Sequence, residues 1–330
     1  MKRCFIYARR MRWDSRQLEA LAAVVTEGSF EAAARALHVT PSALSQRVRA
    51  LEGAAGTVLV RRTRPVGPTE PGRTLLRLAR QVELLDAEAS RELGGEAGGP
   101  GTTPGTTDGT ASGADAAPVT VPLAVNADSL ATWLMPALGR LDGVCVDLHV
   151  ADQDRTVDLL PAGVVMVAVT SQRAPVQGCV SRPLGVMRYR AAASRAFAER
   201  WFPDGPTTAA LRRAPMVVFD RSDGLQDTWL RERAAAAGEP VPAPPRHHVP
   251  STSDFLEAIR LGLGWGMWGP LPGPGASFPL VDERAQEIVP LDDATLDVPM
   301  YLQQWKLRST TLDHVTEALL AEARRSLGRP

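Results

Sequence analysis

The sequence is poor in several residue types whose abundance would have identified a class of protein. Its three cysteines, Cys4, Cys145 and Cys179, are odd in number and widely spaced, which matches neither a disulfide framework nor a zinc site. No run approaches the roughly 20 apolar residues that a membrane-spanning helix requires. The N-terminal segment MKRCFIYARR has charges but lacks the apolar stretch of a signal peptide. We therefore expect a cytoplasmic protein with reduced thiols.

Catalytic and metal-binding signatures are also missing. The five histidines are His38, His149, His247, His248 and His314, and the adjacent pair among them lacks the spacing of metal ligands. The sequence contains no nucleophile elbow, no phosphate-binding glycine loop and no HExxH run. These absences predict a binding protein rather than an enzyme, with no metal and no cofactor.

The chain has no net charge, but its charges are unevenly distributed. In total, 37 Lys and Arg balance 37 Asp and Glu, and only Lys2 and Lys306 are lysines. Residues 1–92 carry 16 basic and 10 acidic side chains, so the remaining residues carry 21 basic and 27 acidic ones. A basic N-terminal part suggests a nucleic-acid partner, although charged runs also serve simply as solvated surface.

Three helical patterns occupy the N-terminal part. Apolar spacing predicts helices over 15–27 and 30–38, with Gly28 as the C-cap of the first. Thr40 is placed to cap a third helix that runs to about residue 54. The segment TVLVRRTRPVGP then predicts a short strand and an arginine-rich hairpin of the kind called a wing. The pattern indicates a winged helix-turn-helix over 11–68; the plain alternative is a three-helix bundle whose arginines only solubilise it.

The third helix is the expected DNA-reading element. Its apolar residues face the core, while its small and polar residues face outward, and a helix of this kind fits the major groove. The wing arginines are expected to contact phosphates or the neighbouring minor groove. The candidate DNA-binding residues are Thr40, Ser42, Ser45, Gln46, Arg47 and Arg49 on the helix, and Arg61, Arg62 and Arg64 on the wing.

Residues 69–93 predict one long helix with a broad apolar stripe. An exposed helix with such a stripe usually needs a partner helix, so we expect a homodimer, with pairing of dimers into a tetramer as the alternative. Residues 94–118 are rich in Gly, Thr, Ala and Pro, which is typical of a flexible linker.

Beyond the linker, over 119–330, short apolar strands alternate with helices. This alternation predicts an α/β domain with mostly parallel strands and helices on both faces. The whole chain is therefore expected to be α/β with an N-terminal winged helix-turn-helix.

The motifs match a family. GSFEAAARALHVTPSALSQRVRALE followed by LVRRTRPVGPTEPGRTLL resembles the N-terminal domain of LysR-type transcriptional regulators. The segments VNADSLATWLMPAL, AFAERWFPDG and APMVVFDRSD resemble the ArgP/LysG (IciA-like) branch of that family. The similarity covers residues 11–330 apart from the Gly-rich segment.

The resemblance implies a fold, a function and partners. The effector domain would resemble periplasmic binding proteins, with one βα subdomain at 119–190 and 290–330 and a second at 191–289. The protein would bind double-stranded operator DNA and RNA polymerase, and would activate an amino-acid exporter gene in response to lysine or arginine. The alternative is an effector-independent nucleoid or replication-inhibiting DNA-binding protein.

The effector site is expected where strands end and helices begin, between the two subdomains. The helix start at 126–133 offers free N–H groups for the carboxylate of an amino acid. Carboxylates that follow two strand ends offer partners for a cation, although each alone is more often a surface loop residue. The candidate effector-binding residues are Asp128, Ser129, Thr132, Asp152, Asp154, Asp220, Asp223, Ser251 and Thr252.

Overall fold

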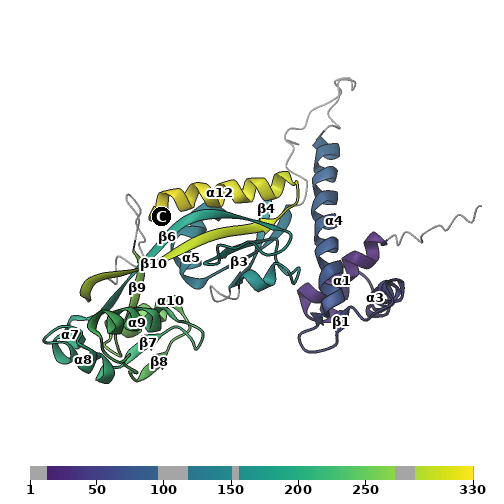
Figure 1. Ribbon diagram of the computed structural model, residues 1–330. Helices are drawn as coiled ribbons and strands as arrows, with labels where there is room; N and C mark the ends of the chain where they lie inside the picture. The colour runs from purple at the N-terminus through teal and green to yellow at the C-terminus, as the bar shows by residue number, and fades with distance from the viewer. Residues whose placement is uncertain (1–12, 96–117, 151–155, 272–286, 330) are drawn as a thin grey trace, which may run out of the picture.

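The computed structural model describes residues 13–95, 118–150, 156–271 and 287–329. An N-terminal group of helices is joined by a long helix, α4, to a larger body built on a mixed sheet (Figure 1). The predicted class, α/β with an N-terminal winged helix-turn-helix, is confirmed. Among the described residues, no helix combines the length and the hydrophobicity needed to cross a bilayer.

Each of the three N-terminal helices begins at a capping residue. Asp14, Ser29 and Thr40 cap the three helices, each accepting a hydrogen bond from a backbone N–H of the first turn. Gly28 and Gly56 follow the first and third helices in the left-handed conformation that glycine adopts without strain. These elements are α1 (Ser15–Glu27), α2 (Phe30–Ala36) and α3 (Pro41–Ala55).

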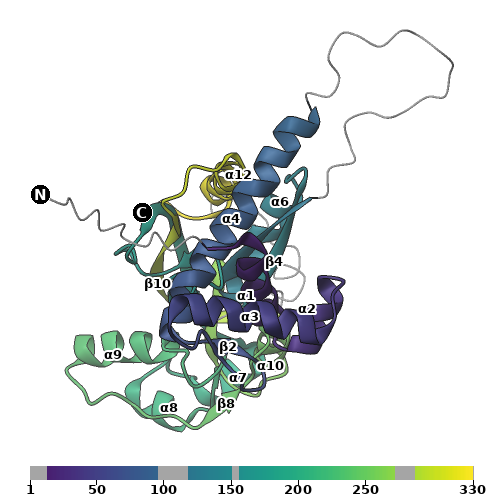
Figure 2. The same cartoon turned by 90° about the vertical axis from the view of Figure 1, so that its right-hand side faces the viewer.

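The wing is a two-stranded hairpin of β1 (Val60–Arg61) and β2 (Gly67–Pro68), which lies beside α3 (Figure 2). Its base is fixed by Glu52 of α3, whose Oε1 accepts from the backbone N–H of Leu59 at 2.9 Å. The side chain of Thr69 donates to the Val58 carbonyl at 2.7 Å. The wing is therefore positioned by polar contacts to both helices that flank it.

Gly72 lets α4 approach the wing. A Cβ at this position would lie 1.9 Å from the carbonyl oxygen of Leu59, and a backbone atom cannot swing away. We expect Gly72→Ala to destabilise the protein by roughly 1–3 kcal/mol, as overpacking does. Thermal unfolding followed by circular dichroism measures this loss.

The matched control is Gly53→Ala on α3, where a Cβ would meet nothing within 4 Å. This substitution should be neutral or stabilising by up to about 1 kcal/mol, because alanine favours a helix over glycine. Equal unfolding temperatures for the two variants would contradict the proposed close approach.

Helix α4 (Glu70–Gly95) connects the two parts of the molecule. At its start it packs on α1, whereas Leu84, near its middle, is buried in the core of the C-terminal body. Further along, Glu88 Oε1 accepts hydrogen bonds from Ser309 Oγ at 2.6 Å and from the N–H of Thr311 at 2.8 Å. Burial raises the pKa of Glu88, but these hydrogen bonds outweigh it and hold the pKa below its usual value. One carboxylate thus ties the long helix to the start of the last helix.

The C-terminal body is built on a six-stranded sheet in the order β4-β3-β5-β10-β6-β9. Strands β3, β4 and β5 are parallel, as the sequence predicted, whereas β10 runs antiparallel to both β5 and β6. The sheet is therefore mixed, because two long strands cross it in opposite directions. Its strands are β3 (Val119–Val125), β4 (Val144–Val150), β5 (Val167–Thr170), β6 (Cys179–Ser194), β9 (Gly266–Leu271) and β10 (Ile288–Trp305).

Strands β6 and β10 extend from the part of the sheet under α12 into a second lobe (Figure 1). In that lobe, a short parallel pair, β7 (Met216–Val218) and β8 (Arg246–His248), lies among helices. The helices of the second lobe are α7 (Arg195–Trp201), α8 (Thr208–Arg213), α9 (Leu225–Ala237) and α10 (Thr252–Arg260). The first lobe holds α5 (Ala127–Ser129), η2 (Leu130–Leu134), α6 (Met135–Leu138), η3 (Thr156–Leu159) and α12 (Thr310–Ser326).

Candidate functional site

The outward face of α3 is polar. Leu44, Val48 and Leu51 are fully buried in the N-terminal core and fix the orientation of the helix. This places the candidate DNA-contacting side chains on the opposite side, where Ser42, Gln46 and Arg49 are exposed and Ser45 and Arg47 partly so. The Thr40 hydroxyl accepts from the N–H of Ala43 at 3.2 Å, so it caps the helix and keeps its own proton for a second acceptor.

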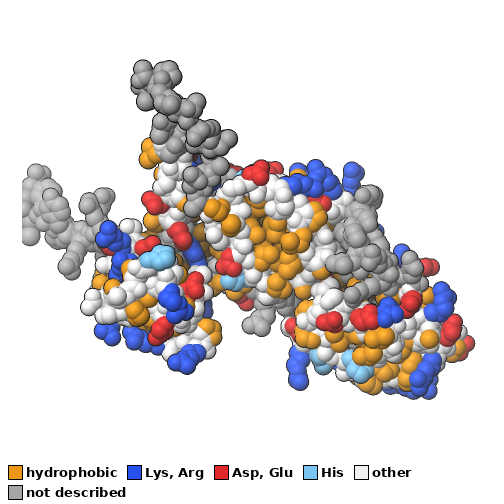
Figure 3. Space-filling model, turned by 180° about the vertical axis from the view of Figure 1, so that it is seen from behind, with side chains coloured by type: hydrophobic (Ala, Val, Ile, Leu, Met, Phe, Trp, Pro, Cys, Tyr) orange, Lys and Arg blue, Asp and Glu red, His pale blue; other side chains and the backbone are white. Residues whose placement is uncertain are grey.

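The three wing arginines, Arg61, Arg62 and Arg64, are all exposed. The guanidinium of Arg62 lies 5.3 Å from the ring centroid of Phe30, at the start of α2. A cation at this distance is attracted by the electrons of the ring face, which restrains the side chain. Blue basic side chains lie along the lower and outer edge of the N-terminal part in Figure 3. The surface has the charge and shape that binding to a phosphate backbone requires.

A cavity of about 470 Å³ lies between the two lobes. Its wall on the first lobe comes from the end of β3 with the start of α5, and from the ends of β4 and β5. The second lobe contributes the β7–α9 loop, α9 and α10, and strands β9 and β10 contribute the remaining residues. The polar lining residues are Asn126, Asp128, Ser171, Asp220, Ser222, Asp223, Gln226, Thr228, Arg231 and Thr252.

Among the described residues, Asp128 is the carboxylate of the first lobe that lines this cavity. Tyr189, on the crossing strand β6, donates its hydroxyl to Asp128 Oδ2 at 2.9 Å. Desolvation raises the pKa of Asp128 to about 6, against the lowering effect of the Tyr189 hydrogen bond, and the nearby charge of Asp223 adds to the rise. Among the described residues, no Lys or Arg forms an ion pair with Asp128. An enclosed carboxylate of this kind would gain from a cationic ligand.

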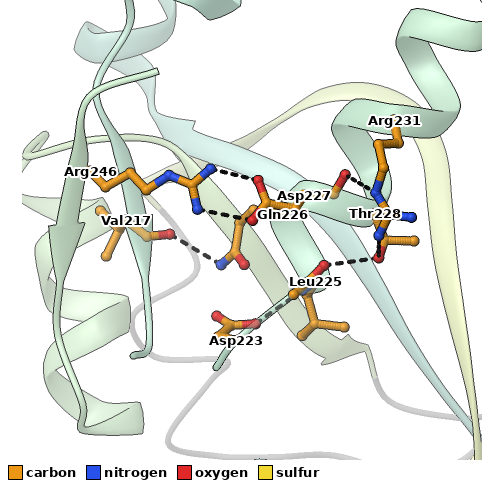
Figure 4. Close-up of polar contacts among 9 residues, drawn as sticks. Val217, Asp223, Leu225, Gln226, Asp227, Thr228, Arg231 and Arg246 are labelled. Atoms are coloured by element: carbon orange, nitrogen blue, oxygen red, sulfur yellow. Dashed lines mark hydrogen bonds and ion pairs between the residues drawn. The ribbon is translucent and has the colours of Figure 1, made fainter. Parts of the chain in front are cut away.

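Two carbonyl oxygens on residues of the cavity lining have no hydrogen-bond partner among the described residues. They are Asn126 Oδ1 and Gln226 Oε1, and both side chains are at least 97% buried, with exposures of 3% and 1%. The amide nitrogen of Gln226 donates to the Val217 carbonyl at 3.1 Å, which turns its oxygen away from β7 (Figure 4). Buried acceptors without partners carry a free-energy cost that a ligand with N–H donors would relieve.

Asp220 and Asp223 also line the cavity, but their carboxylates organise their own loop. Asp220 Oδ1 accepts from the backbone N–H groups of Ser222 at 2.7 Å and Asp223 at 3.1 Å. Asp223 accepts from the N–H of Phe219 at 3.0 Å and from that of Leu225 at 3.1 Å. The loop therefore presents negative charge to the cavity, while the carboxylates accept hydrogen bonds from backbone N–H groups of the same segment.

The remaining predicted effector residues divide into three groups. Thr252 lines the cavity, whereas Ser251 caps α10 by accepting from the N–H of Asp254 at 3.4 Å. Ser129 is fully buried and donates to the sulfur of Met187, and Thr132 Oγ1 donates to the Asp128 carbonyl. Neither of these two lies in the cavity lining. The predicted residues Asp152 and Asp154 lie outside the described part of the chain.

Sequence reasoning missed four residues of this region. Asn126 stands within the VNADSL motif at the predicted helix start, but the sequence assigned no role to its side chain. Gln226 and Arg231 are on α9, and only the rotation of that helix decides that they face the cavity. Tyr189 is in a long strand whose pairing with β10 places it opposite Leu296, which no local pattern indicates.

A polar helix-turn-helix face with an arginine wing, joined by a long helix to a two-lobed domain with a polar cavity, defines a class of protein. It is the class of DNA-binding transcription regulators that carry a small-molecule-binding domain.

Comparison with known proteins places the chain within one family of that class. Residues 15–73 match the model of the bacterial regulatory helix-turn-helix proteins of the lysR family, and residues 119–320 match the LysR substrate binding domain. The chain therefore belongs to the LysR family of transcriptional regulators, as its motifs predicted. Its relatives are regulators and not enzymes.

Individual relatives are similar in sequence to this chain over nearly its full length. The transcriptional regulator LysG of Mycobacterium tuberculosis is 44% identical over 310 residues, which cover 94% of this chain and 93% of the relative. The lysine export transcriptional regulatory protein LysG of Corynebacterium glutamicum is 38% identical, with 93% and 97% covered.

Two solved structures are also similar. The crystal structure of ArgP from Mycobacterium tuberculosis is 41% identical with a TM-score of 0.76, covering 96% of this chain and 99% of the other. LysG from Corynebacterium glutamicum with bound effector Arg is 35% identical with a TM-score of 0.67, covering 96% and 100%.

Proposed function

We propose that this protein is a transcription regulator that binds operator DNA through α3 and the wing and is controlled by a basic amino acid, lysine or arginine, in the cavity between its lobes. In this proposal it activates an amino-acid exporter gene, contacts RNA polymerase and acts as a homodimer or tetramer. Residues 11–68 read DNA, 69–93 form the dimerisation helix and 119–330 bind the effector. Most of the predicted linker at 94–118 lies outside the described residues.

The observation that carries the proposal is the chemistry of the cavity wall around Asp128. A desolvated carboxylate and two partnerless carbonyl oxygens, Asn126 Oδ1 and Gln226 Oε1, are all hydrogen-bond acceptors. An ammonium or guanidinium group consists only of donors and carries the charge opposite to a carboxylate, so it suits a lining of this kind. A neutral or anionic ligand group would leave acceptors unpaired or add repulsion.

The relatives support the same ligand class. LysG of Corynebacterium glutamicum has a solved structure with bound effector Arg, and the name of the LysG of that organism includes lysine export. Dimerisation is supported by apolar side chains on α4, where Leu85 is 41% exposed and Leu93 is 72% exposed. Apolar side chains also gather over the middle of the molecule in Figure 3.

The test is calorimetric titration of the full chain with lysine, arginine and two neutral analogues, norleucine and citrulline. We expect the basic amino acids to bind at least about tenfold more tightly than the neutral ones, because a buried charge pair is lost with each analogue. Gel retardation of the DNA upstream of the proposed exporter gene, with and without the amino acid, completes the test. Retained DNA binding without any amino-acid binding would instead support the effector-independent DNA-binding protein.

A further inference from the structure

Arg231 brings a positive charge to the same cavity from the opposite lobe. It lies on the second turn of α9 and is held by hydrogen bonds to its own helix (Figure 4). Its Nε donates to the Asp227 carbonyl at 3.2 Å, and Nη2 donates to Thr228 Oγ1 at 3.0 Å. Thr228 Oγ1 donates in turn to the Gly224 carbonyl at 2.9 Å. The guanidinium is thus oriented by neutral oxygens, without neutralisation of its charge.

Two other arginines of this lobe are paired with carboxylates. Arg246 forms a bidentate pair with Asp227, at 2.9 and 2.7 Å, and Arg233 is paired with Asp292. Within the described residues, Arg231 forms no ion pair. Among the described residues, Arg231 is the only Lys or Arg in the cavity lining. The other polar groups of the lining are mostly hydrogen-bond acceptors.

The cavity therefore carries both signs of charge, with the carboxylates of Asp128, Asp220 and Asp223 and the guanidinium of Arg231 in its lining. A ligand that carries both a cation and a carboxylate matches this arrangement in one orientation and meets like charges in the other. Guanidinium groups bind carboxylates through paired N–H donors, and these charge-assisted hydrogen bonds are stronger than neutral ones.

We propose that Arg231 binds the carboxylate of the effector and so fixes the direction in which the effector lies in the cavity. This inference rests on the proposed function, since it assigns one end of the same ligand. It differs from the sequence-based expectation, which placed the carboxylate at the helix start near Asn126. In the structure that position is lined by acceptors, so it suits the cationic part of the effector.

The test compares arginine with agmatine, which is arginine without its carboxylate, on the wild-type protein and on Arg231→Gln. The variant should bind arginine at least about tenfold more weakly, because a charge-assisted contact is lost. It should bind agmatine as the wild type does, because agmatine has no carboxylate to lose. The control is Arg221→Gln, an exposed arginine of the preceding loop outside the cavity lining, which should leave both affinities unchanged.

Each other outcome overturns a specific statement. If Arg231→Gln binds arginine as tightly as the wild type, or loses arginine and agmatine to the same extent, Arg231 does not bind the carboxylate. If the wild type binds neither lysine nor arginine, the proposed function itself fails. Thermal unfolding shows whether the Arg231→Gln variant is folded. Arg231→Lys keeps the charge, so it should bind arginine more tightly than Arg231→Gln does. If the loss of affinity came only from a structural defect, Arg231→Lys would not restore it.

Discussion

Replacing Asp128 by asparagine is expected to weaken the binding of lysine or arginine by at least about 100-fold, because it removes one partner of an enclosed charge pair. The side chain keeps nearly the same volume, so the cavity and the fold should persist. DNA affinity in the absence of effector should remain at the wild-type level, since Asp128 lies in the other part of the molecule. Calorimetry measures the first quantity and gel retardation the second.

Asp142→Asn is the matched control, because Asp142 is an exposed carboxylate of the first lobe outside the cavity lining. It should bind the amino acid as the wild type does. If Asp128→Asn retained wild-type affinity, the cationic part of the effector would have to lie elsewhere, and the central argument for a basic ligand would be lost.

The raised pKa of Asp128 adds a pH dependence of defined sign. Since desolvation lifts this pKa to about 6, protonation neutralises the carboxyl below that pH. Affinity for a cationic effector should therefore fall about tenfold between pH 7 and pH 5. The Asn variant lacks the titrating group and should lack this part of the pH dependence.

The same shift has a consequence for the protein without ligand. The carboxyl binds its proton more tightly in the folded state than in the unfolded chain, where its pKa is near 3.8. Its contribution to stability is therefore fully present below about pH 4 and is lost as pH rises through about 6. Asp128→Asn should accordingly raise the unfolding temperature of the ligand-free protein at pH 8.

Replacing Arg47 and Arg49 together by alanine is expected to reduce DNA affinity by at least about 100-fold at physiological salt, because two charged contacts are lost. The stability of the N-terminal domain should be nearly unchanged, since neither side chain forms an ion pair within the described residues. If both arginines contact phosphates, the slope of log affinity against log salt should fall in magnitude by roughly 1.8. Retardation assays over a range of salt concentrations give both quantities.

Arg212 and Arg213 supply the charge-matched control. They are exposed on α8 in the distant lobe, so replacing both by alanine removes the same charge without touching the predicted DNA surface. If the two double variants lost equal affinity, the effect would reflect net charge alone, and the assignment of α3 as the reading helix would fail.

The sequence determined those features that depend on neighbours within one or two helical turns. The cap at Thr40, the glycine after α1, the buried stripe of α3 and the arginine wing were all predicted from such local patterns. Each depends on a backbone N–H three residues away or on a side chain one turn away, so its signal is contained in a short stretch of sequence. The family also followed from these stretches.

The tertiary structure alone decided which residues share the cavity. Its lining runs from Asn126 to Val298 in sequence, because the long antiparallel strands β6 and β10 join the two lobes. Helix rotation then turned Arg231 toward the cavity and Ser129 into the core, although both stand in equally polar stretches. Side-chain direction in a helix is set by what the helix packs against, and those partners lie far away along the chain.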